Sequence, residues 1–174
     1  MSETKPFRSA VIGVGWAGEF HVRALAKIHG AQLVAVCDLD STKAQAVLDK
    51  YDQSVPVRSS LNELLEKDKP DILHVAVPSA LHHDVAVAAM QRHVDVIVEK
   101  PLDVTLPRID SMLLAARETG TRIAGIFQNR FNPASQILKR TIDDGRFGQI
   151  TWAGAFVLWV RDAQQDNRSV CFRF

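Results

Sequence analysis

The fold of this chain is indicated by residues 10–38, which read AVIGVGWAGEFHVRALAKIHGAQLVAVCD. A short apolar run at Ser9–Ile12 predicts a buried strand, and the glycine-rich turn Gly13–Gly18 follows it. Residues 17–29 carry apolar side chains at helical spacing, and a second apolar run, Leu33–Cys37, predicts a strand that ends at an acidic residue. Strand, glycine turn, helix, strand and terminal acid together predict a βαβ unit that binds a dinucleotide.

Each glycine of the turn has a separate physical role in this prediction. Gly13 can adopt the backbone angles of a tight turn, Gly15 lets the main chain approach a pyrophosphate, and Gly18 lets the helix pack closely on its strand. Free N–H groups at the start of the helix then face the phosphates. The turn supplies these predicted cofactor-binding residues: Gly13, Gly15, Trp16, Ala17 and Gly18. The alternative is a glycine turn that serves only compact packing.

The acid at the end of the second strand indicates which dinucleotide is bound. Asp38 lies where a carboxylate can accept hydrogen bonds from a ribose diol. A 2′-phosphate at this point would meet like charge, and neither Leu39 nor Asp40 offers a compensating cation. The sequence therefore predicts NAD as the cofactor, with NADP disfavoured.

Composition excludes several other classes of protein. The chain has 174 residues, with 21 basic and 20 acidic side chains and no basic block, so a nucleic-acid partner is not expected. The first residues lack the apolar core of a signal peptide, and no apolar run is long enough to span a bilayer. Two distant cysteines, Cys37 and Cys171, indicate neither a disulfide framework nor a metal site. We expect a cytoplasmic protein with no membrane partner.

The rest of the first 127 residues continues the alternation of strand and helix. Strands are expected at 55–57, 72–77, 94–98 and 122–127, and helices at 40–50, from Ser60 onward, at 80–92 and at 105–119. This order predicts an α/β fold with a doubly wound parallel sheet. Ligands of such sheets bind at the carboxyl ends of the strands, so the residues that follow each strand should line one edge.

Beyond Phe127 the pattern changes. Asn132-Pro133 predicts the start of a helix with one apolar face, which Gly145 can end. A long strand rich in aromatic residues is expected at 150–160, with no later strand to pair with. Its side chains Trp152, Phe156, Leu158 and Trp159 predict an exposed apolar face and association through this strand.

Four motifs together resemble the Gfo/Idh/MocA oxidoreductases, over residues 8–160. These are the glycine turn with Asp38, the stretch Pro78–His82, the triplet Glu99-Lys100-Pro101, and Arg130 followed by Gly145–Ile150. The resemblance implies an NAD(P)-dependent dehydrogenase of sugars, inositols or related polyols, which forms homo-oligomers at full length. It also implies a Rossmann domain at 1–127 and, at 128–174, the truncated start of an α+β substrate domain.

Site residues follow from the resemblance position by position. Lys100 matches the catalytic lysine, and His82 matches the histidine of a Thr-Pro-Asn-x-x-His stretch beside the nicotinamide, although Val77 and Ser79 replace the Thr and Asn. Gln128 matches a position on the nicotinamide side. Outside the glycine turn, the predicted cofactor-binding residues are Asp38, Pro78, Leu81, His82, Glu99, Lys100 and Gln128.

At Lys100 the expected chemistry is proton exchange with the substrate hydroxyl on the carbon that loses hydride. The alternative is a surface lysine at the end of a strand. Adjacent His82 and His83 cannot face the same way on a helix, so no metal site is expected, and His83 should face solvent. The other histidines, His21, His29, His74 and His93, are expected to be structural.

Two other functions stay open at this point. One is a non-catalytic, NAD-binding regulatory or sensor module, and the other is a defective truncated product without a function. The family's substrate domain carries a later His-x-x-x-Asp-type pair that assists proton transfer, whereas no histidine follows His93 here. Lys100 favours the dehydrogenase over the sensor.

Overall fold

The computed structural model describes residues 5–154 of the chain. The chain divides into two compact units, Met1–Ile126 and Phe127–Phe174, which we describe separately. Among the described residues, no helix combines the length and the apolar character needed to cross a membrane.

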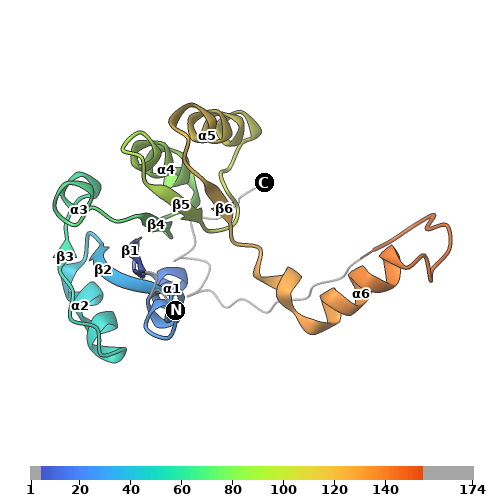
Figure 1. Ribbon diagram of the computed structural model, residues 1–174, viewed down its shortest axis with the longest axis horizontal. Coiled ribbons are helices and arrows are strands. Elements are labelled where there is room, and N and C mark those ends of the chain that lie inside the picture. The colour runs from blue at the N-terminus through green and yellow to red at the C-terminus, as the bar shows by residue number, and fades with distance from the viewer. Residues whose placement is uncertain (1–4, 155–174) are drawn as a thin grey trace, which may run out of the picture. The chain divides into compact units, whose positions relative to one another are not determined.

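The first unit is built on one sheet of six parallel strands (Figure 1). In spatial order the strands are β3-β2-β1-β4-β5-β6, so the chain starts in the middle and winds outward in both directions. This order confirms the predicted doubly wound sheet. The strands are β1 (Phe7–Ile12), β2 (Ala31–Cys37), β3 (Val57–Arg58), β4 (Ile72–Val75), β5 (Asp95–Val98) and β6 (Ile123–Gly125).

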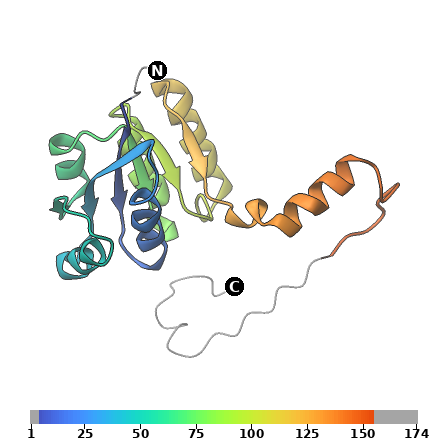
Figure 2. The same ribbon diagram turned by 60° about the horizontal axis from the view of Figure 1, so that its bottom comes forward.

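Helices cover both faces of the sheet (Figure 2). The helices α1 (Trp16–Leu25) and α2 (Ser41–Lys50) share one apolar cluster with Val11 of β1. The helices α3 (Leu61–Lys67), α4 (His82–Met90) and α5 (Leu106–Thr119) share the other cluster with Ala10 and Ile12. Neighbouring residues of β1 thus point to opposite faces, as the pleat of a strand requires, and both faces are apolar because both are covered.

The ends of the three central strands are level. Ile12 of β1 is in register with Val75 of β4, which is in register with Val98 of β5. The ladder continues one residue further, because the N–H of Glu99 donates to the Val75 carbonyl at 3.0 Å. The segments that follow β1, β4 and β5 therefore begin at the same height on one edge of the sheet.

Local capping explains several of the helix boundaries. The Asp40 side chain accepts from the N–H of Lys43 and caps α2, and the Ser60 side chain accepts from the N–H of Glu63 and caps α3. Gly120 takes the left-handed conformation that ends α5. The helix α1 ends at Leu25, four residues before the predicted end, because the chain then turns back and the Gly30 carbonyl accepts from Phe7 at the start of the sheet.

The second unit contains a short 3₁₀-helix at Gln128–Phe131 and the helix α6 (Pro133–Asp143). As predicted, Asn132 caps α6 and Pro133 is its first residue. The apolar residues of this helix, Ile137, Leu138 and Ile142, are exposed. Residues 150–154 form no strand, and the remainder of the strand predicted at 150–160 lies outside the described residues, as do Phe156, Leu158, Trp159 and Cys171.

Candidate functional site

The three glycines of the turn differ in the space around them. A Cβ on Gly13, whose φ is +83°, would lie 2.6 Å from the Ala76 carbonyl oxygen, and a Cβ on Gly18 would overlap the Gly13 carbonyl oxygen. Around Gly15 the nearest atom to such a Cβ is the Lys43 ammonium nitrogen at 4.0 Å. Gly13 and Gly18 are therefore needed for packing, whereas Gly15 faces open space, as a residue beside a ligand would.

The start of α1 presents unpaired backbone donors. The first N–H group that bonds back into this helix is that of Glu19, which donates to the Gly15 carbonyl at 2.9 Å. Within residues 5–154, the N–H groups of Gly15, Trp16, Ala17 and Gly18 donate to no protein acceptor. No side chain caps this end, so these groups and the helix dipole are available to an anion such as a pyrophosphate.

Asp38 lies at the carboxyl end of β2, beside the glycine turn. One carboxylate oxygen accepts from the N–H of Val14 at 2.6 Å, and the other accepts from the N–H of Asp40 at 3.0 Å. A carboxylate can accept about four hydrogen bonds, so acceptor positions remain for the hydroxyls of a ribose. The structure thus brings Asp38 and the glycine turn together at one edge.

Lys100 lies at the same edge, directly after β5. It is exposed, and among the described residues its ammonium group forms no hydrogen bond or ion pair, while its backbone N–H donates to Glu99 Oε2 at 3.1 Å. The peptide bond between Lys100 and Pro101 is cis. Lys100 is therefore a free amine beside the end of β4.

Glu99 is contacted by His21, which was expected from the sequence to be structural. The Nε2 of His21, on α1, lies 3.1 Å from Glu99 Oε1, and the Nδ1 of His21 lies 2.9 Å from Nδ1 of the buried His74 on β4. Burial raises the pKa of the Glu99 carboxyl, but the hydrogen bonds from His21 and from the Lys100 N–H outweigh it, so the pKa lies below its ordinary value. His21 and His74 thus belong to this site.

His82 lies behind the edge rather than on it. Its side chain is buried, with 1% of its surface exposed, and its ring nitrogens lie 2.8 Å from the carbonyl oxygens of Val77 and Pro101. No ring nitrogen is left for a cofactor atom, so His82 supports the site by holding Pro101. The prediction that His83 faces solvent is wrong, because its partly buried ring contacts Asp84 and Ser111 between α4 and α5.

The remaining predicted residues divide between the two units. Pro78 precedes a short 3₁₀-helix after β4 and Leu81 is its last residue; both are exposed, as is Trp16 at the start of α1. Gln128 begins the 3₁₀-helix of the second unit, so its role beside the nicotinamide stays a prediction. No group of three or more potential metal ligands occurs among residues 5–154.

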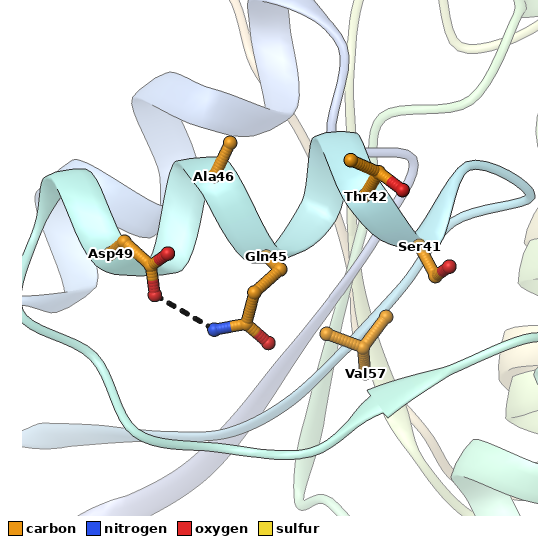
Figure 3. Close-up of a pocket in the computed structure, with 6 residues that line it drawn as sticks. All are labelled: Ser41, Thr42, Gln45, Ala46, Asp49 and Val57. Carbon is orange, nitrogen blue, oxygen red and sulfur yellow. Dashed lines mark hydrogen bonds between the residues drawn. The ribbon is translucent and has the colours of Figure 1, made fainter.

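A shallow groove of about 560 Å³ lies between α2 and β3 (Figure 3). Ser41, Thr42, Gln45, Asp49 and Val57 line it together with Ala46, and Gln45 donates to Asp49 at 2.8 Å. None of the predicted site residues contributes to it. The groove therefore gives no evidence for a further ligand-binding site.

Comparisons with known proteins identify the family of this chain. The family profile GFO_IDH_MocA, described as an oxidoreductase family with an NAD-binding Rossmann fold, matches residues 7–127. An inositol 2-dehydrogenase of Salmonella paratyphi B is 33% identical over 144 residues, which are 82% of this chain and 43% of that protein. The chain thus spans less than half the length of this relative.

Solved structures give the same result. The crystal structure of myo-inositol 2-dehydrogenase from Lactobacillus plantarum matches with a TM-score of 0.78 and 28% identity, over 84% of this chain and 43% of that one. The WlbA dehydrogenase of Bordetella pertussis, solved in complex with NADH and UDP-GlcNAcA, matches with a TM-score of 0.76 and 32% identity. That match covers 83% of this chain and 45% of the WlbA chain.

Proposed function

Because this chain belongs to the Gfo/Idh/MocA family of oxidoreductases, we propose that it supplies the NAD-binding part of a dehydrogenase of sugars, inositols or related polyols. Residues 1–127 form its cofactor domain, and residues 128–174 begin its substrate domain. The observation that carries the proposal is the meeting of Asp38, the glycine turn and Lys100 at one edge of the sheet.

The cofactor would be held by contacts of three kinds. The free N–H groups at the start of α1 bind the pyrophosphate, and Gly15 leaves room for it. Asp38 accepts hydrogen bonds from the adenosine ribose and repels a 2′-phosphate, so NAD is preferred over NADP. Bound NAD supplies the hydride acceptor for oxidation of a carbinol carbon.

Lys100 acts on the proton that leaves with the hydride. Its side chain is exposed at the strand edge, and it would hydrogen-bond the substrate hydroxyl and take up its proton as the carbinol becomes a carbonyl. Among the described residues Glu99 forms no hydrogen bond with this amine; its carboxylate accepts from His21 and from the Lys100 backbone N–H.

A binding assay and a turnover assay test the proposal together. We expect the polypeptide that carries this sequence in its native source to bind NAD in calorimetry and to reduce it with at least one member of a polyol and sugar panel. Lys100→Ala should abolish turnover while NAD still binds, whereas Lys27→Ala, at an exposed lysine, should change neither turnover nor NAD affinity.

The two assays also separate the alternatives. Binding of NAD without turnover on any member of the panel would favour a regulatory or sensor module. Absence of NAD binding would overturn both functions. We further infer a cytoplasmic homo-oligomer, which sedimentation of the native polypeptide would test; a monomer would contradict it.

A further inference from the structure

Two histidines, 53 positions apart in the sequence, meet where the helix α1 packs on the strand β4. His74 lies on β4, between Leu73 and Val75, which belong to the apolar cluster of the opposite face. It therefore points toward α1, where its ring meets that of His21 edge-on, with centroids 5.0 Å apart. His74 is 8% exposed and the His21 side chain is 10% exposed, so both imidazoles are shielded from solvent.

When the His21 ring is neutral, the hydrogen bonds of this pair have only one consistent direction. The Glu99 carboxylate has a lowered pKa and only accepts, so His21 must donate to it from Nε2. In a neutral ring the Nδ1 of His21 then carries a lone pair, and His74 must donate to it from its own Nδ1. Burial lowers the pKa of His74 to about 3, so His74 is a neutral donor.

The chain of hydrogen bonds ends at the backbone of Lys100. The second oxygen of Glu99 accepts from the Lys100 N–H, while on the far side of Lys100 the Pro101 carbonyl is held by His82. Both ends of the short segment that carries Lys100 are thus fixed, and its side chain is left free.

Simple filling of the core does not explain this arrangement. Burying two imidazoles and a carboxylate costs free energy that apolar residues of the same volume would not cost. A role in positioning explains why this cost is retained. If the Glu99 carboxylate were free to rotate beside Lys100, it could pair with the lysine ammonium group.

We propose that His21 is a positioning residue for Lys100, with His74 fixing its tautomer, so that Glu99 is held away from the lysine amine. This inference rests on the proposed function, since it assigns Lys100 as the group to be positioned. The helix α1 would then have two roles. Its first turn faces the cofactor, and His21 in its second turn orients the Glu99 carboxylate next to Lys100.

The first test reads the tautomers directly in the cofactor-free chain. Nitrogen-15 NMR of the imidazoles should show His21 with its proton on Nε2 and His74 with its proton on Nδ1 at neutral pH. The opposite tautomer at either residue would overturn the proposal. This measurement needs no variant, so it stands even where a substitution prevents folding.

The second test measures the reactivity of the Lys100 amine. Lys100 acylation is measured by mass spectrometry relative to the exposed Lys27, for His21→Leu, His21→Gln and the matched control His29→Leu. His21→Leu should slow labelling of Lys100 about threefold or more, because the released Glu99 pairs with it. His21→Gln, whose amide can donate to Glu99, should restore the rate, and His29→Leu should not change it.

Equal labelling of Lys100 in wild type and a folded His21→Leu variant would overturn the positioning role. So would a Gln variant that behaves like the Leu variant. Neither measurement uses NAD, so a chain that fails to bind NAD would refute the proposed function and leave this result readable. In the active native polypeptide, His21→Leu should lower kcat and leave the KM for NAD unchanged.

Discussion

The carboxylate of Asp38 accepts a hydrogen bond of 2.6 Å from the backbone N–H of Val14, inside the glycine turn. The end of β2 therefore fixes the loop that follows β1, and the residue proposed to bind the ribose also shapes the phosphate-binding turn. One side chain thus links the recognition of two parts of the same cofactor.

This double role predicts that Asp38→Asn weakens NAD binding more than loss of a ribose contact alone. Hydrogen bonds to a charged group contribute about 1.5–3 kcal/mol, which corresponds to a loss of affinity of about 10- to 100-fold. The preference for NAD over NADP should also decrease, because the repelling charge is gone. Calorimetric titration with both dinucleotides measures these changes.

The matched control for this variant is Asp49→Asn, which removes the same charge from an exposed position on α2. It should leave both affinities within about twofold, as for a surface substitution away from the site. Tighter binding of NADP than of NAD by the unaltered protein would refute the role given to Asp38.

The glycines of the turn should separate into two classes on substitution by alanine. Gly13→Ala and Gly18→Ala should each destabilise the fold by about 2 kcal/mol or more, since their Cβ atoms would meet backbone atoms and Gly13 has a φ of +83°. Gly15→Ala should change stability by less than about 0.5 kcal/mol but reduce NAD affinity about tenfold or more. Urea denaturation and NAD titration of the three variants measure both quantities. If Gly15→Ala binds NAD as the wild type does, the open space beside Gly15 is not the pyrophosphate site.

His82 should contribute to stability more than its neighbour does. His82→Phe would remove the buried ring N–H that the carbonyl oxygen of Val77 or of Pro101 accepts, at a cost of about 2 kcal/mol in the free energy of unfolding. His83→Phe loses contacts with the exposed Asp84 and with Ser111, and should cost about 1 kcal/mol or less. Denaturant unfolding of both variants compares them, and equal losses would contradict the bracing role of His82.

Much of the fold was predictable because its determinants are local. The apolar strands and the glycine turn depend on residues close together in the sequence, and they were found in the expected order, although the strand predicted at 55–57 is formed by Val57–Arg58. The end of α1 was predicted too late, since apolar periodicity continues to Ile28 although the chain must already turn back toward β2. A packing requirement overrode the local pattern there.

The site was predictable only where a motif carried it. Asp38 and Lys100 follow strands directly, so the parallel sheet alone places them at one edge. The contact between His21 and His74 depends on how α1 lies over β4, and no spacing in the sequence indicates it. The direction in which His82 points depends likewise on the fold around Pro101, which a helical pattern at 80–92 does not define.

The neutral, buried state of His74 predicts a specific dependence of stability on pH. Its pKa is about 3 in the folded protein, whereas an unfolded histidine has a pKa of about 6.5. Between these values the unfolded chain binds a proton that the folded chain does not, so the free energy of unfolding decreases as pH falls below 6.5. His74 alone should lower stability by about 2 kcal/mol between pH 7 and pH 5.

The Glu99 carboxylate, whose folded pKa is lowered, adds a loss of the same sign, but only as pH falls through about 4.5 and below. The window from pH 7 to pH 5 therefore separates the contribution of His74 from that of Glu99. His74→Asn should remove this part of the decrease, and His93→Asn, at an exposed histidine with a φ of +59° that asparagine tolerates, should keep it. Urea unfolding of the three proteins at pH 7, 6 and 5 measures the difference. Parallel curves for wild type and His74→Asn would mean that His74 takes up its proton at the same pH in the folded and unfolded states, and the assignment of His74 as a buried neutral donor would then be wrong.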